Sequence, residues 1–208
     1  MPDLLVFDYI GTFAFAAFGA YLAERKGYDI FGVFTVALVS ALGGGTLREM
    51  LFNNLPVYFY QYGYWPAVLL GTALAVVFYK KFSRIHRFML AIDAVGLVTF
   101  AYIGASRAAE EGLGFFAIAT CAVLTAVGGG ILRDIVMRET PIIFYRDFYA
   151  TAAFLVGVGY FFFESYMHTP WVVYLLLASA FLLRLASIRF GIELWKPHKP
   201  ETEEAAVR

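Results

Sequence analysis

The chain has 208 residues, of which 61% are hydrophobic and 15% are charged, and its mean hydropathy is +0.71. Soluble globular domains are about half apolar and a quarter charged, so this composition argues against a soluble or disordered protein. Sixteen Lys and Arg balance sixteen Asp and Glu, so no basic excess favours a nucleic-acid partner.

Seven apolar stretches follow one another along the chain, and a helix needs about 20 mostly apolar residues to cross a bilayer. They cover residues 4–23, 30–50, 65–79, 88–107, 113–135, 149–163 and 170–189. The runs are continuous and do not alternate, which favours helices over a transmembrane barrel. The sequence therefore predicts an all-α integral membrane protein with seven transmembrane helices in a domain of residues 1–190. A polar tail, 191–208, follows it.

The basic residues predict the orientation of these spans. Seven spans place the chain ends on opposite sides of the membrane, and only Arg48 and Arg107 of the sixteen basic residues fall on the side of the N-terminus. Because basic residues concentrate on the cytoplasmic side, we expect the N-terminus outside and the tail in the cytoplasm. The first stretch lacks the positively charged start of a signal peptide, so we expect it to be retained in a cell membrane.

The first half of the chain repeats in the second half. Residues 8–60 align with residues 93–145 at a constant spacing of 85, and 20 of the 53 aligned positions are identical. A chain of this composition would give about four identities by chance. Each repeat, 4–79 and 88–163, holds three spans, and span 170–190 lies outside both. Since three is odd, the second copy enters the membrane inverted, as in many transporters.

Two glycine triplets are the most informative motifs in the repeats. The sequences GGGTLRE and GGGILRD place Gly43, Gly44 and Gly45 in the second span and Gly128, Gly129 and Gly130 in the fifth. Three successive glycines weaken a helix, and discontinuous helices in paired repeats point to a binding or conduction site. Carbonyls freed there could hold a cation or the ammonium of an amino acid. The alternative is close helix packing, which small residues permit.

Charged residues follow each triplet. Arg48 and Glu49 end the second span, and Arg133 and Asp134 end the fifth. Arginine is costly in a bilayer, so each pair is either an ion pair near the membrane surface or a gate at the mouth of a pathway.

A second symmetric pair lies at the start of the first and fourth spans. Asp8 and Asp93 would cap their helices in water or concentrate cations at the two mouths.

Seven spans, two inverted repeats and a GGGxLR[ED] motif in each together resemble the prokaryotic trimeric intracellular cation (TRIC) channel family, over about residues 4–190. Related bacterial sequences form a glycine-transporter domain family. The resemblance implies a homotrimer with one pore in each protomer, permeable to K⁺ and to some degree to Na⁺. It also implies that Gly43–Gly45 and Gly128–Gly130 bend the second and fifth helices at the pore.

Three functions follow from these observations. The first is a passive K⁺ channel, the second is a carrier of glycine or another small neutral solute, and the third is a structural or lipid-binding membrane protein. The single cysteine, Cys121, and the absence of HExxH and GxxxxGK[ST] motifs give no support to metal-dependent or ATP-driven activity. We therefore expect no enzyme, no cofactor and no resident metal; K⁺ or Na⁺ would only pass through. Membrane lipid and further copies of the chain are the expected partners.

Overall fold

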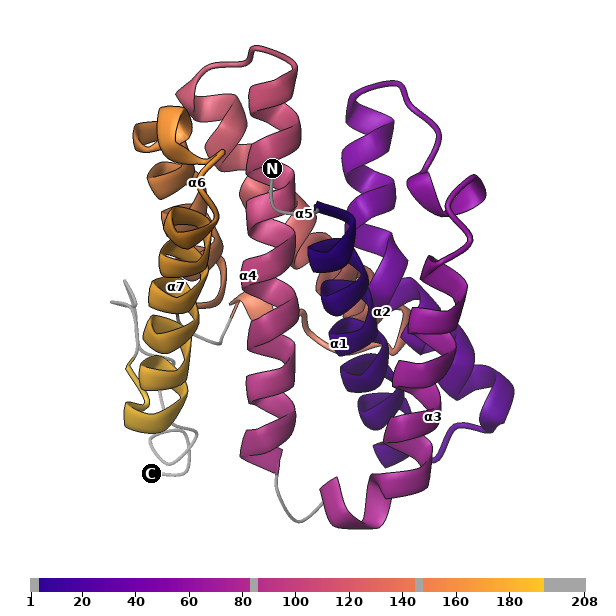
Figure 1. The fold of residues 1–208 in the computed structure, drawn as a ribbon. Coiled ribbons are helices and arrows are strands. Elements are labelled where there is room, and N and C mark those ends of the chain that lie inside the picture. The colour runs from indigo at the N-terminus through magenta and orange to yellow at the C-terminus, as the bar shows by residue number, and fades with distance from the viewer. Residues whose placement is uncertain (1–3, 83–85, 145–147, 193–208) are drawn as a thin grey trace, which may run out of the picture.

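The computed structural model describes residues 4–82, 86–144 and 148–192 (Figure 1). Within these ranges the chain forms seven α-helices and no β-strand, so the predicted fold class is confirmed. The helices are α1 (Leu4–Arg25), α2 (Ile30–Leu51), α3 (Tyr64–Phe82), α4 (His86–Glu110), α5 (Phe115–Val136), α6 (Tyr149–Phe162) and α7 (Pro170–Phe190). Short 3-10 helices, η1 (Val57–Phe59), η2 (Ile142–Phe144) and η3 (Glu164–Tyr166), follow α2, α5 and α6. All but two residues of the predicted tail 191–208 lie outside the described ranges, so the domain division stays a prediction.

Five of the helices are long and apolar enough to cross a membrane by length and composition, namely α1, α2, α4, α5 and α7. The remaining two, α3 and α6, contain shorter apolar segments. With 14 residues, α6 is about 21 Å long, which is less than the roughly 30 Å of a hydrocarbon core. Successive helices run in opposite directions (Figure 1). The chain is an integral membrane protein.

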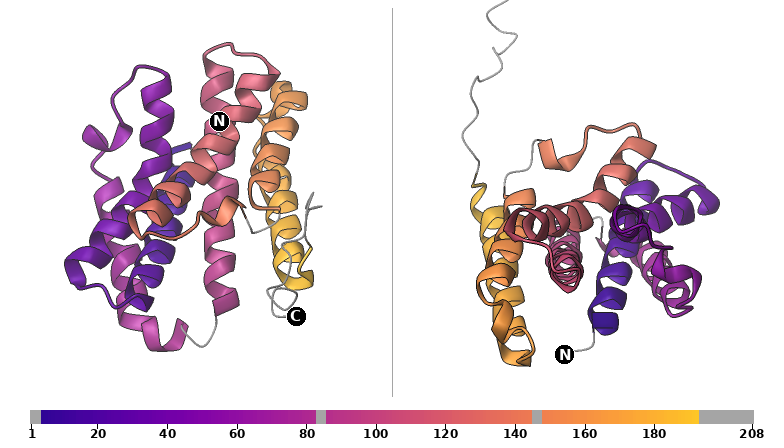
Figure 2. Two further views of the ribbon diagram at one scale, coloured as in Figure 1. Left: turned by 180° about the vertical axis from the view of Figure 1, so that it is seen from behind. Right: turned by 90° about the horizontal axis from the view of Figure 1, so that it is seen from above.

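The two repeats form inverted three-helix halves. In Figure 1, α4 runs opposite to its equivalent α1. The halves meet where α1 packs on α4 and α2 packs on α5. The seventh helix, α7, packs on α4 and α6 and so extends the second half alone. Figure 2 shows α6 and α7 at one edge of the molecule and α3 at the other.

Equivalent glycines end the first helix of each half. Gly27 and Gly112 have φ angles of 75° and 69°, a region that costs other residues strain. After Gly27, Tyr28 N–H donates to the Ala23 carbonyl at 3.3 Å, and Leu113 N–H donates to that of Ala108 at 3.1 Å. These bonds satisfy carbonyls that each helix end leaves free.

The pseudo-two-fold relation between the halves brings two aromatic side chains together. Phe15 and Phe100 occupy equivalent positions and pack edge to face, with ring centroids 5.0 Å apart. Each ring lies against a glycine of the other half, because a Cβ on Gly11 would lie 2.8 Å from the Phe100 ring and one on Gly96 would meet the Phe15 ring. Both phenylalanines are buried.

The glycine triplets do not interrupt their helices, so the predicted helix breaks are wrong. Both α2 and α5 continue through the triplets to Leu51 and Val136. A Cβ on Gly44 would strike the Thr125 carbonyl oxygen, and one on Gly129 would strike the Ser40 carbonyl oxygen. The glycines therefore let the two helices cross at close range, the packing that small residues allow. Intact helical hydrogen bonds also avoid the cost of unpaired backbone groups in an apolar interior.

Candidate functional site

Two clusters of charged side chains lie one in each half, toward opposite ends of the bundle. The first cluster contains Asp8 of α1, Arg48 and Glu49 of α2, Tyr64 of α3 and Arg107 of α4. The second cluster contains Asp93 of α4, Arg133 and Asp134 of α5, Tyr149 of α6 and Arg184 of α7. Four members of each cluster are related by the spacing of 85, so each cluster is a copy of the other with one arginine supplied separately.

In the first cluster, Arg48 binds its neighbour in the chain. Its Nε donates to Glu49 Oε1 at 2.8 Å, and Arg107 Nη2 lies 3.9 Å from Glu49 Oε2. Tyr64 donates its hydroxyl to Asp8 Oδ2 at 2.6 Å. Arg48 Nη1 is buried without a hydrogen-bond partner among the described residues. This atom is available to a ligand or to water.

In the second cluster, Arg133 is fully enclosed. Its Nε donates to Asp134 Oδ1 at 2.8 Å, and its Nη1 lies 3.9 Å from Asp93 Oδ1. Tyr149 donates its hydroxyl to Asp93 Oδ1 at 3.2 Å. The guanidinium of Arg133 lies 5.1 Å from the ring centre of Phe18, and that of Arg184 lies 5.0 Å from the ring centre of Tyr149. Both are cation–π distances.

Each cluster contains two carboxylates and two guanidinium groups, and Arg107 of the first cluster also forms an ion pair with Glu110 at 2.9 Å. Such pairing matters because an unpaired buried charge costs several kcal/mol. In the first cluster Arg107 supplies the second positive charge from α4, and in the second cluster Arg184 supplies it from α7. A positively charged arginine therefore does not by itself repel a cation from either site.

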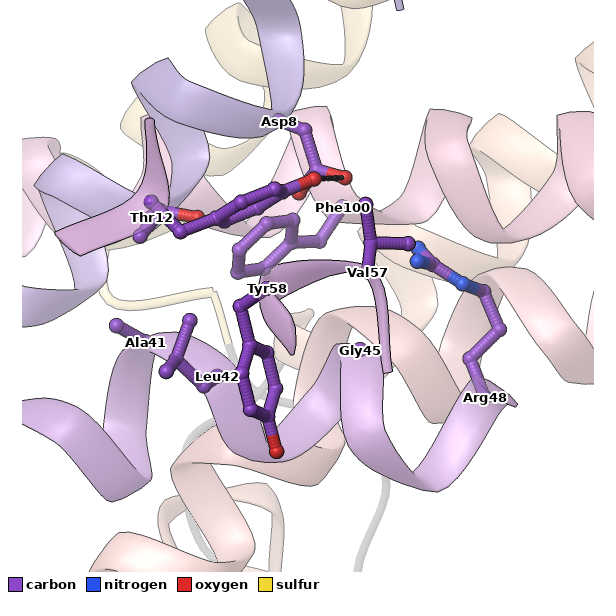
Figure 3. Close-up of a pocket in the computed structure, with 10 residues that line it drawn as sticks. Asp8, Thr12, Ala41, Leu42, Gly45, Arg48, Val57, Tyr58 and Phe100 are labelled. Atoms are coloured by element: carbon purple, nitrogen blue, oxygen red, sulfur yellow. Dashed lines mark hydrogen bonds between the residues drawn. The ribbon is translucent and has the colours of Figure 1, made fainter. Parts of the chain in front are cut away.

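Two neighbouring cavities adjoin the first cluster. The outer cavity has a volume of about 220 Å³, and its lining includes Arg107, Tyr60 and Gln61. The inner cavity has about 20 Å³, enough for one water molecule, and its lining includes Thr12, Gly45 and Phe100. Asp8, Arg48, Val57 and Tyr64 line both cavities. Figure 3 shows Asp8 at the top and Arg48 at the right among the residues that line the inner cavity.

The equivalent space beside the second cluster is closed and holds no water-sized volume. Its walls repeat those of the inner cavity, since Val127, Gly130, Arg133, Ile142, Ile143 and Tyr149 correspond to Leu42, Gly45, Arg48, Val57, Tyr58 and Tyr64. The two halves thus form the same pocket twice, once hollow and once collapsed.

The structure divides each glycine triplet between two roles. The first two glycines, Gly43–Gly44 and Gly128–Gly129, lie in the helix crossing. The third, Gly45 or Gly130, lines the pocket of its own half. A Cβ on either one would have no neighbour closer than 3.5 Å. Only the third glycines lie where a pathway could pass.

The structure brings the predicted charged residues together, with Asp8 near Arg48 and Glu49 and with Asp93 near Arg133 and Asp134, a grouping that the sequence analysis did not predict. Sequence reasoning missed the tyrosines, although Tyr64 and Tyr149 keep the spacing of 85 a few residues beyond the aligned block. It also gave no role to Arg184, since α7 has no equivalent in the other half.

The fold and the site together define a membrane protein of the inverted-repeat class, with a cluster of buried charges in each half. The family model described as "Glycine transporter" matches residues 5–80 and 90–165. The chain belongs to this family. The two matched segments correspond to the two structural halves.

Solved structures share the whole architecture. A structure described as the basis for conductance through TRIC cation channels is 32% identical and covers 95% of this chain and 98% of its own, with a TM-score of 0.84. A TRIC channel from Rhodobacter sphaeroides is 33% identical, with 92% and 100% coverage and a TM-score of 0.80. The resemblance to the prokaryotic TRIC family is therefore confirmed.

Bacterial membrane proteins are similar in sequence. The UPF0126 membrane protein of Deinococcus radiodurans is 41% identical over 155 residues, which is 73% of this chain and 72% of the relative. The UPF0126 inner membrane protein YadS of Escherichia coli is 35% identical over 193 residues, or 90% and 92%.

Proposed function

We propose that this chain is a K⁺-permeable channel for monovalent cations, with one pore in each protomer between the two halves. The observation that carries the proposal is the pair of neighbouring cavities beside the first cluster, which share Asp8 and Arg48 in their linings. The outer one reaches Arg107 and the inner one reaches Thr12 and Phe100. Polar groups in an otherwise apolar bundle are expensive to maintain, and in membrane proteins they mark ion or substrate pathways.

The glycine-bearing helices α2 and α5 would line this pore through Gly45 and Gly130. Beyond the inner cavity, the proposed path meets the packed rings of Phe15 and Phe100 and then the collapsed pocket at Arg133. The structure would thus represent a closed state, in which aromatic side chains block the middle. Opening would require the second pocket to widen until it holds a cavity like the one in the first half.

Two relatives support a proposal for the assembly and placement of the channel. The structure from Rhodobacter sphaeroides is of a trimeric channel, and the relative in Escherichia coli is an inner membrane protein. We therefore propose a homotrimer in the inner membrane, surrounded by lipid. Its N-terminus would lie outside and its C-terminus in the cytoplasm, because fourteen of sixteen basic residues fall on one side.

A carrier of glycine or another small neutral amino acid is the second candidate. The name of the matched family suggests it, and one feature of the site favours it. Asp8 and Arg48 line the same cavity, so an ammonium and a carboxylate of one ligand could each meet an opposite charge. A pocket that is hollow in one half and closed in the other would also suit alternating access.

Purified protein in liposomes and planar bilayers distinguishes the two candidates. A channel predicts discrete K⁺ currents and no saturable uptake of labelled glycine by the same preparation. A carrier predicts saturable glycine uptake without unitary currents, and this result would overturn the channel.

A variant tests the proposed path itself. Replacing Gly45 with Leu fills the inner cavity, and we expect it to reduce K⁺ current at least severalfold. The control is Gly114→Leu, since a Cβ on Gly114 meets nothing within 4 Å and this glycine lies outside both cavities. Equal currents in both variants would contradict a path past Gly45.

A further inference from the structure

The hydroxyl of Thr12 is the least expected polar group in the inner cavity. Thr12 is fully buried, and its Oγ1 has no hydrogen-bond partner among the described residues. A threonine inside a helix usually bonds the carbonyl one turn back. Four other helical threonines do so at 2.6–2.8 Å, namely Thr35, Thr46, Thr72 and Thr99. Thr12 does not form this bond, although α1 also has a backbone carbonyl one turn before it.

Asp8 lies one helical turn before Thr12, so both side chains are on the same face of α1. Both line the inner cavity (Figure 3). Asp8 Oδ2 accepts the Tyr64 hydroxyl. Its second oxygen accepts no hydrogen bond from any residue that the structure describes. The lining of the cavity therefore includes one carboxylate oxygen and one hydroxyl oxygen that have no hydrogen-bond partner among the described residues.

We infer that the inner cavity is a binding site for one monovalent cation, held by Asp8 and Thr12 and completed by water from the outer cavity. This inference rests on the proposed channel function, because the bound ion would be the permeating one. A volume of about 20 Å³ admits one particle of the size of a water molecule. A largely dehydrated alkali-metal ion fits this limit.

The charge of the site selects the class of ion. Divalent cations are commonly held by several carboxylates, and no group of three His, Cys, Asp or Glu suited to a metal occurs among the searched residues. Asp8 alone supplies one negative charge to the cavity. The nearby positive charge of Arg48 is offset by Glu49, which it contacts at 2.8 Å. One negative charge and neutral oxygens match a monovalent ion.

The site belongs to the first half alone. The position equivalent to Thr12 is Leu97, which is fully buried and carries no oxygen in its side chain. Asp93, the equivalent of Asp8, instead lies 3.9 Å from Arg133 Nη1. The inferred site is therefore asymmetric, with one ion on the side of the first cluster.

The test compares Thr12→Val, which keeps the shape and removes the oxygen, with Thr12→Ser, which restores the oxygen. Thr72→Val is the matched control, because Thr72 is also buried but bonds its own helix. Unitary current is measured against KCl concentration in bilayers that contain the full chain. We expect Thr12→Val to raise the half-saturating K⁺ concentration about threefold, the loss of one polar ligand. Thr12→Ser and Thr72→Val should remain close to the wild type.

A second measurement does not require conduction. Thermal unfolding of the detergent-solubilised protein is followed in KCl and in N-methyl-D-glucamine chloride at equal ionic strength. We expect K⁺ to raise the Tm of the wild type and of Thr72→Val, and to raise that of Thr12→Val much less. Asp8→Asn should lose the stabilisation as well.

The two measurements separate the inference from the channel function. K⁺ currents with equal saturation in all variants, and no K⁺-specific stabilisation, would show that the cavity holds only water, while the channel would stand. K⁺-specific stabilisation that Thr12→Val abolishes, in a protein without K⁺ current, would support the site and overturn the channel.

Discussion

The first and second clusters carry nearly the same residues in opposite states. Beside the first, Asp8 and Arg48 line cavities of about 20 and 220 Å³, whereas Arg133 in the second lies in a pocket without room for water. The difference comes from residues that the repeat does not share. Phe18 lies under Arg133, while its equivalent, Ile103, only lines the outer cavity. Duplication therefore supplies the pocket, and the unshared residues determine whether it is open.

A second unshared residue is Arg184. It comes from α7, which extends only the second half, and its guanidinium lies over the ring of Tyr149. Tyr149 in turn donates to Asp93. Through this chain of contacts the seventh helix stabilises the closed pocket. The first cluster receives Arg107 instead, whose side chain is 37% exposed at the rim of the outer cavity.

The largest expected effect tests what both halves share, the helix crossing. Gly44→Ala and Gly129→Ala should each destabilise the protein by at least about 1–3 kcal/mol, since the new Cβ would overlap a carbonyl of the opposite helix. Thermal unfolding in detergent measures the loss. Gly45→Ala and Gly130→Ala are the controls, and they should be neutral or stabilising because alanine favours helix. Equal losses at all four positions would contradict the division of each triplet into packing and cavity-lining glycines.

Hydropathy and self-comparison predicted much of this architecture from the sequence. Apolar length placed all seven helices with ends within three residues, because the bilayer imposes one strong constraint on every span. The spacing of 85 predicted which residues of the two halves are equivalent. Helix continuity at Gly44 and Gly129 escaped prediction, because it depends on a contact between helices far apart in the sequence. Likewise, the sequence could not predict which pocket is open, because residues such as Arg48 and Arg133 are identical in the two repeats.

The next effect distinguishes the clusters by burial. Arg133→Met should cost about 3–5 kcal/mol, because it leaves Asp93 and Asp134 as buried carboxylates without this partner. Arg48→Met should cost about half as much, since Arg107 still lies near Glu49 and the cavity admits water to Asp8. Chemical denaturation of the two variants measures both losses. A larger loss of stability for Arg48→Met than for Arg133→Met would contradict the conclusion that Arg133 is the more enclosed of the two arginines.

Accessibility measures the same difference directly. In a Cys121→Ser background, we expect a thiol-reactive methanethiosulfonate to modify Gly45→Cys roughly tenfold faster than Gly130→Cys, because reaction needs an accessible thiolate. Both positions have space for a Cβ. Adding Phe18→Ile should bring the modification rate of Gly130→Cys closer to that of Gly45→Cys, since it removes the ring beneath Arg133. Equal rates without Phe18→Ile would mean that the second pocket is open in the membrane.

The smallest effect concerns a contact that joins the halves beside the second cluster. Lys26 forms an ion pair with Glu139 and donates to the Met137 carbonyl at 2.7 Å. Because both side chains are partly exposed, Lys26→Met should cost less than about 1 kcal/mol. The loss should shrink in high salt, which screens exposed pairs. Unfolding at low and high ionic strength measures the loss of stability and its dependence on salt. If the loss is equally large in high salt, the stabilisation comes from the hydrogen bond to the Met137 carbonyl alone.

The same contact can be moved to the other half. The positions equivalent to Lys26 and Glu139 are Glu111 and Asn54, which cannot form this ion pair. The double variant Glu111→Lys with Asn54→Glu recreates the charges beside the first cluster. Glu111→Gln changes the net charge by the same amount without forming an ion pair and is the control. If unshared contacts set the state of each pocket, the first variant should slow modification of Gly45→Cys modestly. An unchanged rate would leave Phe18 and Arg184 as the residues that hold the second pocket closed.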